Sequence, residues 1–253
     1  MSFDQWRSLV DGAEIDIGSD IPDSGLKHRY DATELDLSDG ETVSSWSDGE
    51  GAADLSGGNP TFVEDAHNTE PAVRFDGSDD ILEAINDASD WTFLSNGSEW
   101  TIYLIAAPRG DVFSNQLSPM GTADSTDSDI GLTIDYPDSS SDTVRFILSN
   151  GSEFTYLEDG LGTLSEDTLS MWGGLHDGSQ IEFRLDGAEQ RTESADASYS
   201  PDAPENALQV GASAANDYFD GDICEILIYE QELTSSERDD LENALAEKWG
   251  ISI

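Results

Sequence analysis

The segment that decides the fold is Phe219-Asp220-Gly221-Asp222-Ile223-Cys224-Glu225-Ile226-Leu227-Ile228-Tyr229. Side chains alternate between the two faces of a β-strand, so Glu225 and Leu227 face one way and Ile226 and Ile228 face the other. The second set reads as a buried stripe, and we expect Cys224 to lie in it as a small apolar side chain. The segment therefore predicts a strand with one face in a core.

A helix is predicted directly after this strand. Thr234 is the expected N-cap, and Glu237 three residues later completes a capping box. Apolar side chains then recur on one helical face, at Leu241, Leu245 and Trp249. Gly250 is expected to end the helix.

Upstream of this strand, from about residue 26, short apolar runs alternate with turn residues. The clearest runs are 72–75, 100–107, 130–134, 143–148, 169–175, 180–185 and 208–210. Pairs such as Asn150-Gly151 and Asp186-Gly187 are typical of tight hairpin turns. Many short strands without intervening helices predict an all-β fold, a two-layer antiparallel β-sandwich closed by one C-terminal helix.

Three blocks of sequence resemble laminin-G-like, concanavalin A-like jelly-roll domains. They are Tyr30–Leu35 with the following Val43–Asp48, then Pro71–Leu82, and then Phe219–Tyr229 with its helix. The blocks stand in the order found in such domains, and the resemblance covers about residues 26–253. It implies a jelly-roll sandwich. It does not fix an activity, because this fold carries lectins, adhesins, hydrolases and structural spacers.

The charge of the chain is strongly negative. Among 253 residues, 55 are Asp or Glu and 10 are Lys or Arg, which gives a net charge of −45. Repulsion at this density competes with a typical stability of about 5–15 kcal/mol, and multimolar salt screens it. We therefore expect a halophilic source. Nucleic acid is not an expected partner, because no basic patch can be assembled.

Other features bound the class of protein. No stretch approaches the length of apolar residues needed for a membrane span. The start of the chain lacks the basic and apolar pattern of an ordinary secretion signal, so we expect none. With a single cysteine, Cys224, no intrachain disulfide can form.

Residues 1–25 are predicted to form an N-terminal arm that docks during assembly. A breaker, Pro22-Asp23-Ser24-Gly25, separates this arm from the domain of residues 26–253. An exposed apolar arm is unfavourable, so we expect it to pack on its own domain or on a neighbour. The candidate assembly residues are Phe3, Trp6, Leu9, Val10, Ile15 and Ile17.

Asp76, Asp79 and Asp80 are the candidate metal ligands. Calcium takes six to eight oxygen ligands from flexible loops, and this turn supplies several carboxylates. The resemblance supports the same prediction, since laminin-G-like domains often hold calcium near the rim of a sheet. The alternative is that these are solvated turn residues, because Asp favours turns.

Catalytic motifs are weak. Glycosidases of this fold place paired carboxylates on one strand, and Glu225 and Glu230 are the nearest match. However, Leu227 stands where a middle Asp is expected, and Glu230 falls on the opposite strand face from Glu225. The three histidines lie in unrelated segments, and no Gly-x-Ser-x-Gly motif occurs. We therefore expect that the chain is not an enzyme.

Carbohydrate binding requires aromatic rings beside polar groups in rim loops. The candidates are Tyr136, Tyr156, Trp172 and Tyr218, each of which is also compatible with a place in the core.

Three functions remain in competition. The first is a non-catalytic structural protein on the exterior of a halophilic virion, a spike, decoration or tail-fibre component with a lectin-like domain. Its expected partners are other virion proteins, further copies of itself and host-surface glycans. The second is a cellular carbohydrate-binding or adhesion domain on the surface of a halophile. The third, a glycoside hydrolase, is the least favoured.

Overall fold

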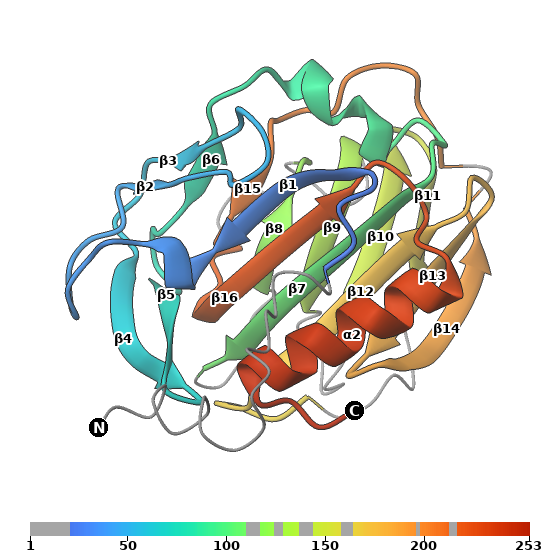
Figure 1. Cartoon of the computed structure of the whole chain (residues 1–253). Helices are drawn as coiled ribbons and strands as arrows, with labels where there is room; N and C mark the ends of the chain where they lie inside the picture. Colours follow the sequence, from blue (N-terminus) through green and yellow to red (C-terminus); the bar gives the residue numbers. More distant parts are fainter. Residues whose placement is uncertain are drawn as a thin grey trace.

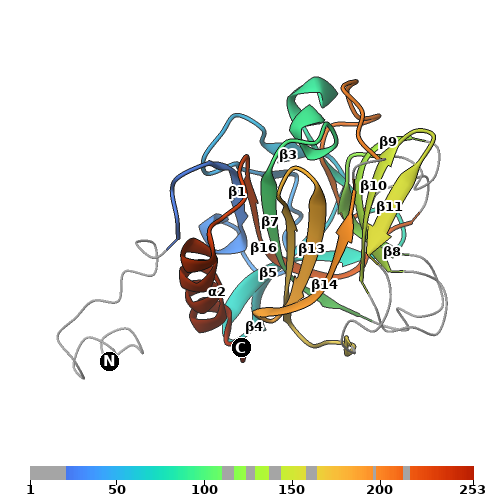
Figure 2. The same cartoon turned by 90° about the vertical axis from the view of Figure 1, so that its right-hand side faces the viewer.

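The computed structural model describes residues 21–109, 117–123, 129–136, 144–157, 164–195, 198–212 and 217–253. Within these segments, two antiparallel β-sheets of eight strands face each other. One α-helix, α2 (Ser235–Trp249), lies on the outer face of one sheet, as Figures 1 and 2 show. The predicted all-β sandwich with a C-terminal helix is confirmed.

The sheet that carries α2, here called the front sheet, has the order β14-β13-β12-β7-β16-β5-β4, and β1 also pairs with β16. Its strands are β1 (Leu26–Asp31), β4 (Thr61–His67), β5 (Glu70–Asp76), β7 (Trp100–Pro108), β12 (Ser170–His176), β13 (Gln180–Leu185), β14 (Ala188–Ser194) and β16 (Asp220–Tyr229).

The opposite sheet, here called the back sheet, has the order β11-β10-β9-β8-β15-β6-β3-β2. Its strands are β2 (Ser45–Trp46), β3 (Leu55–Ser56), β6 (Leu82–Ala84), β8 (Leu117–Gly121), β9 (Ile130–Tyr136), β10 (Arg145–Asn150), β11 (Phe154–Leu157) and β15 (Gln209–Val210). Two 3-10 helices, η2 (Ala32–Glu34) and η3 (Ala88–Leu94), lie in the connections.

Strand β7 separates two hydrophobic cores. Ile102, Leu104 and Ala106 point between the sheets into the sandwich core. Tyr103 and Ile105 point the other way, into a second cluster that we call the helix core. Because both faces of β7 are covered, its sequence is a continuous apolar run instead of an alternating one.

The helix closes the helix core as its sequence predicts. Its apolar face supplies Leu241, Leu245 and Trp249 to that cluster. Thr234 is the N-cap, and its side chain and that of Glu237 form the expected capping box. Gly250 follows with a φ of 71°, a left-handed conformation that glycine adopts without strain.

A β-bulge in β16 changes the expected side of Cys224. The register of β16 against β7 shifts between Ile223 and Glu225, which makes Cys224 the extra residue. Ile223 and Ile226 lie in the sandwich core, whereas Cys224 lies in the helix core. The prediction that Cys224 shares a stripe with Ile226 is therefore wrong, although its burial is as expected. Burial raises the pKa of the Cys224 thiol well above its usual value.

Candidate functional site

Glu225, the first member of the glycosidase-like pattern, is fully buried beneath α2. Its Oε1 atom accepts a hydrogen bond from Arg29 Nε at 2.9 Å. Its Oε2 atom accepts from Lys248 Nζ and from Trp249 Nε1, each at 2.8 Å. Both carboxylate oxygens are therefore engaged by side chains of β1 and α2.

Asp31 completes this network from the end of β1. Its Oδ2 atom accepts from Lys248 Nζ at 2.5 Å and from Arg29 Nη2 at 3.0 Å. Burial alone would raise the pKa of Asp31, but Lys248 and the hydrogen bonds of Thr33 hold that pKa below its usual value. We call the set Arg29, Asp31, Glu225, Lys248 and Trp249 the helix clamp, because it ties α2 to the front sheet.

Glu230, the second member of the pattern, lies in a different environment. Its side chain is 51% exposed and pairs with Lys27 Nζ at 2.6 Å. Leu227, which stands between the two in sequence, lies in the helix core. A glycosidase needs two carboxyl groups that flank one accessible bond. In this arrangement the helix covers one carboxylate and solvent surrounds the other.

A second buried network fixes the middle of α2. Glu242 Oε1 accepts from Tyr103 Oη and from Arg184 Nε, both at 2.6 Å. Arg184 also donates to Glu182 of the same strand at 2.9 Å. Burial and the Glu242 carboxylate raise the pKa of Tyr103 well above its usual value. At ordinary pH the Tyr103 hydroxyl therefore stays protonated and donates a structural hydrogen bond to Glu242.

The described histidines are held by structural partners. His28 Nδ1 lies 2.6 Å from Asp48 Oδ2, and its ring stacks on Trp91 with centroids 4.5 Å apart. His28 Nε2, the atom that would activate a nucleophile, is buried and has no hydrogen-bond partner in the described part of the chain. His67 bonds to Asp222, and His176 bonds to the carbonyl of Ser98. The His28–Asp48 pair therefore braces the loop that follows β2.

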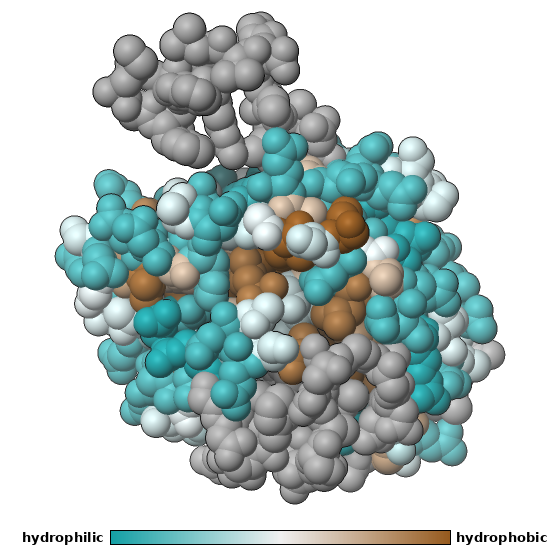
Figure 3. Space-filling view, turned by 90° about the horizontal axis from the view of Figure 1, so that it is seen from below, coloured by the Kyte–Doolittle hydropathy of each residue, from teal (hydrophilic) through white to brown (hydrophobic). Residues whose placement is uncertain are grey.

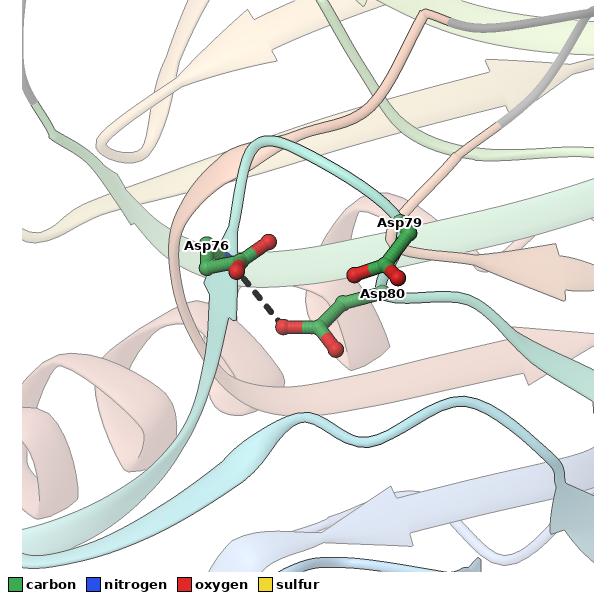
Figure 4. Close-up of side chains that lie close together, drawn as sticks. All are labelled: Asp76, Asp79 and Asp80. Atoms are coloured by element: carbon green, nitrogen blue, oxygen red, sulfur yellow. Dashed lines mark hydrogen bonds between the residues drawn. The ribbon is translucent and has the colours of Figure 1, made fainter.

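The structure brings the three candidate metal ligands together. Asp76 at the end of β5 and Asp79 and Asp80 in the turn that follows it point toward one another, as Figure 4 shows, and offer ligand oxygens within 4.8 Å of one another. Asp76 and Asp79 are exposed and Asp80 is buried. Asp220 of β16 stands opposite Asp76 in the register of the sheet, which the sequence did not reveal.

Carboxylate oxygens of the turn also accept backbone hydrogen bonds, which stabilise the turn without a cation. Asp80 Oδ2 accepts from the Asp76 N–H at 3.1 Å, and Asp80 Oδ1 accepts from the Asn59 N–H at 3.3 Å. Asp76 Oδ1 accepts from the Ser78 N–H at 2.9 Å. Burial, and then the neighbouring Asp76 and Asp79 charges, raise the pKa of Asp80, whereas its backbone hydrogen bonds lower it. Three carboxylates fit part of a calcium shell of six to eight oxygens, so calcium stays a prediction.

The aromatic candidates fall into different environments. Trp172 is completely buried in the sandwich core, so it offers no ring to a ligand in this structure. Tyr218 is half-buried beside β8. Tyr136 ends β9, and its side chain lies outside the described atoms. Tyr156 is 42% exposed.

Tyr156 has an aromatic neighbour that the sequence analysis did not select. Phe154 lies two residues earlier on β11 and is also 42% exposed. The two rings stack, with centroids 5.6 Å apart and planes at 19°. Strand alternation after the Asn150-Gly151 turn was the available signal, because it puts residues 154 and 156 on one face.

The candidate assembly residues Phe3, Trp6, Leu9, Val10, Ile15 and Ile17 lie outside the described residues. The first described residue, Ile21, is buried in the helix core. In Figure 3, apolar side chains gather in a hollow at the end of the sandwich where the chain terminates. Of the last residues there, Ile251 packs against the helix core and Ile253 is exposed.

Most described basic side chains form ion pairs with carboxylates of the same chain. Of the nine Lys and Arg residues in the described segments, eight form ion pairs with carboxylates. Several of the partner carboxylates are buried, among them Glu225, Asp222 and Asp135. The described segments contain no helix that is both long enough and apolar enough to cross a bilayer.

Comparison with known proteins gives a family and a fold. The profile of the "Concanavalin A-like lectin/glucanases superfamily" matches residues 76–237. No curated protein sequence matches the chain.

Three solved structures illustrate the likeness. Domain 4 of AbnA, a GH43 extracellular arabinanase from Geobacillus stearothermophilus, in complex with arabinotriose, has 16% identity and a TM-score of 0.60, covering 87% of this chain and 100% of that chain. Trypanosoma rangeli sialidase in complex with sialic acid has 12% identity and a TM-score of 0.62, covering 90% and 34%. The binding domain of Paraclostridial Mosquitocidal Protein 1 has 13% identity and a TM-score of 0.63, covering 86% and 55%. This chain thus spans about a third of the sialidase, and at these identities the likeness shows the fold alone.

Proposed function

Because this chain belongs to the concanavalin A-like lectin/glucanases superfamily, we propose that it is a non-catalytic, lectin-like recognition domain. The proposal extends to its place of action, the exterior of a virion that assembles in concentrated salt. There it takes part in assembly and in attachment to host-surface glycans.

The observation that carries the non-catalytic part is the burial of Glu225 in the helix clamp. Its two oxygens hold Arg29, Lys248 and Trp249, and α2 covers it. Freeing this carboxylate for a sugar would leave Arg29 and Lys248, which are mostly buried, with Asp31 as their remaining carboxylate partner, and it would remove the acceptor that Trp249 Nε1 uses, which is unfavourable. The carboxylate of the glycosidase-like pattern therefore supports the fold.

Recognition is supported by the solved relatives. The arabinanase domain that aligns over its whole length is in complex with arabinotriose, and the mosquitocidal protein contributes a binding domain. The first is one domain of a larger enzyme, so a unit of this fold serves there beside other domains, and this chain covers 55% of the second. We propose a saccharide-binding role for this chain by the same logic.

Action in concentrated salt is supported by where the charges lie. The accessible surface of 10,843 Å² shared by a net charge of −45 leaves about 240 Å² for each uncompensated charge, a spacing of about 15 Å. The described basic residues are mostly engaged in ion pairs, so they do not relieve the repulsion elsewhere. Multimolar salt weakens the repulsion between the carboxylates, because the Debye length falls to about 3 Å at 1 M.

The virion role is supported by the sequence of residues 1–25. Its apolar residues, Phe3, Trp6, Leu9, Val10, Ile15 and Ile17, suit docking onto another virion protein or a further copy of this chain. The second candidate is a cellular carbohydrate-binding or adhesion domain of a halophile. The full-length alignment with a domain of an extracellular arabinanase favours it as the alternative.

The test uses the full chain in about 3 M KCl, a concentration chosen for screening. Binding to arrayed glycans and release of reducing sugar are measured on the same preparation. We expect binding without hydrolysis. Sugar release that the Glu230→Gln change abolishes would contradict the proposal, and so would the failure to bind any glycan.

The virion role has its own test. Particles assembled with the full chain, or with residues 26–253 alone, are separated on a density gradient. We expect the full chain in the particle fraction and the shorter chain in the soluble fraction. Equal incorporation of both would show that the arm is not the docking segment, and absence of both from particles would favour the cellular alternative.

A further inference from the structure

We propose that Phe154 and Tyr156 on β11 form the binding platform for an uncharged pyranose chain. This site rests on the proposed lectin-like function and locates it on the molecule. It lies on the outer face of the back sheet, at its edge, away from α2 and the helix clamp.

The sequence of β11 puts both rings on the outer face. Leu157 lies in the sandwich core, so Thr155 shares its inward face and the two aromatic residues face outward. The register with β10 places Phe154 opposite Ser149 and Tyr156 opposite Ile147. β11 is the terminal strand of its sheet, so no further strand of the described residues flanks the rings on that side.

The exposure of these rings is unusual for this chain. Trp46, Trp91, Trp100, Trp172 and Trp249 are all fully buried. Within the described segments, the large apolar side chains that are exposed are Ile85, Phe154, Tyr156 and Ile253. Only the two aromatic ones adjoin each other, and they form a stacked pair. Two adjacent half-exposed rings offer a small apolar surface on which a ligand can pack.

The backbone on either side holds the rings in place. In the preceding turn, Asn150 Oδ1 accepts from the Ser152 N–H at 2.9 Å and from the Glu153 N–H at 2.8 Å. On the inward side, Thr155 Oγ1 lies 2.7 Å from Ser198 Oγ, which ties β11 to the segment after β14. A preorganised platform loses little conformational entropy when a ligand binds.

The chemistry of the platform selects the ligand. A pyranose ring has an apolar C–H face, which packs on the negative face of an aromatic ring, and a rim of hydroxyl groups. Ser152 and Glu153, in the turn before β11, are exposed, and Ser152 precedes Phe154 by two residues, so its hydroxyl is a candidate for hydrogen bonds to such hydroxyls. Because the two rings stack on each other, with centroids 5.6 Å apart and planes at 19°, each covers part of one face of the other, and the faces turned away from the stack remain for sugar units.

Charge excludes the acidic sugars. In concentrated salt long-range repulsion is screened, so binding of a sialylated or sulfated glycan depends on direct pairing with cations, and eight of the nine described Lys and Arg side chains already pair with carboxylates. Arg191, which lies on the neighbouring edge strand β14, pairs with Glu193 at 2.6 Å. An uncharged chain of hexoses or pentoses is therefore the ligand class that fits.

The test compares the wild-type chain with Phe154→Ala, Tyr156→Ala and the double variant. Binding to neutral, sialylated and sulfated glycan arrays is measured in about 3 M KCl. We expect each single change to weaken binding to neutral glycans roughly 3- to 10-fold, which is the range for one aromatic contact. Tyr156→Phe keeps the ring and is expected to bind like the wild type. Ile85→Ala removes another exposed apolar side chain elsewhere and is the matched control.

Each outcome bears on a different part of the proposal. A wild-type chain that binds no glycan refutes the proposed function and this site with it. Neutral-glycan binding that the double variant keeps refutes the site alone, and preferred binding of sialylated or sulfated glycans refutes the ligand class. If the wild type is oligomeric and the double variant is monomeric with unchanged glycan binding, the rings form a contact between copies and the site is again refuted. Near-ultraviolet circular dichroism confirms that each variant is folded.

Discussion

The helix clamp makes a quantitative prediction about Glu225. Changing Glu225→Gln removes one of the two carboxylate charges that hold Arg29 and Lys248, since Asp31 remains, while keeping nearly the same shape. Removing one partner of a buried ion pair costs about 3–5 kcal/mol. The side chains of Arg29 and Lys248 are 19% and 13% exposed, so water solvates them in part. We therefore expect the lower end, a loss of about 3 kcal/mol in the free energy of unfolding.

The assay is urea unfolding followed by tryptophan fluorescence in about 3 M KCl, because guanidinium would change the ionic strength. A loss of this size moves the midpoint by about 1 M urea or more. The matched control is Glu230→Gln, which removes the exposed pair with Lys27 and should cost at most about 1 kcal/mol. If the two variants are equally stable, or if Glu225→Gln costs under about 0.5 kcal/mol, the clamp is not a significant source of stability and the reasoning fails.

Three further predictions follow from charge and backbone geometry. Lowering KCl from about 3 M to about 0.1 M should unfold the chain reversibly, as measured by circular dichroism, and unchanged stability in dilute buffer would refute the salt argument. Burial alone would raise the pKa values of Asp31 and Asp222, but Lys248 and Arg74 hold both below the usual value. A carboxyl with a lowered folded pKa stabilises the fold above its unfolded pKa, so stability should fall as the pH drops below about 4, and a flat profile there would contradict this. Gly211→Ala should prevent folding or lower the free energy of unfolding by several kcal/mol, because the φ angle of Gly211 is +88° and an added Cβ would lie 2.1 Å from the Phe75 ring. The check is a thermal melt, and a melting temperature equal to that of the wild type would show that the backbone shifts to accommodate the Cβ.

Much of the fold could be predicted because apolar runs and turn residues mark it. Every predicted strand segment overlaps an observed strand, and the capping box and Gly250 bound the helix. The strand β14, Ala188–Ser194, could not be found in this way, since as an edge strand its sequence is almost entirely polar. It is held by backbone pairing to β13.

The bulge at Cys224 could not be predicted for a different reason. Both faces of β16 are buried, so a shift of one residue still leaves its apolar side chains in a core, and no pattern in the sequence marks the shift. The calcium candidates and Tyr156 could be selected from the sequence, whereas Phe154 was missed. The role of Glu225 depends on Arg29, which lies 196 residues away in the chain and meets it only in the folded sheet.

The ion pairs inside the fold affect how the molecule meets its neighbours. With eight of the nine described Lys and Arg side chains paired with carboxylates, the exterior presents mostly one sign of charge. A neighbour of similar acidic composition offers few opposite charges to it, so ion pairs do not hold the two together. Binding between such molecules must therefore come from uncharged contacts, so small neutral areas of the surface determine which partners the protein binds.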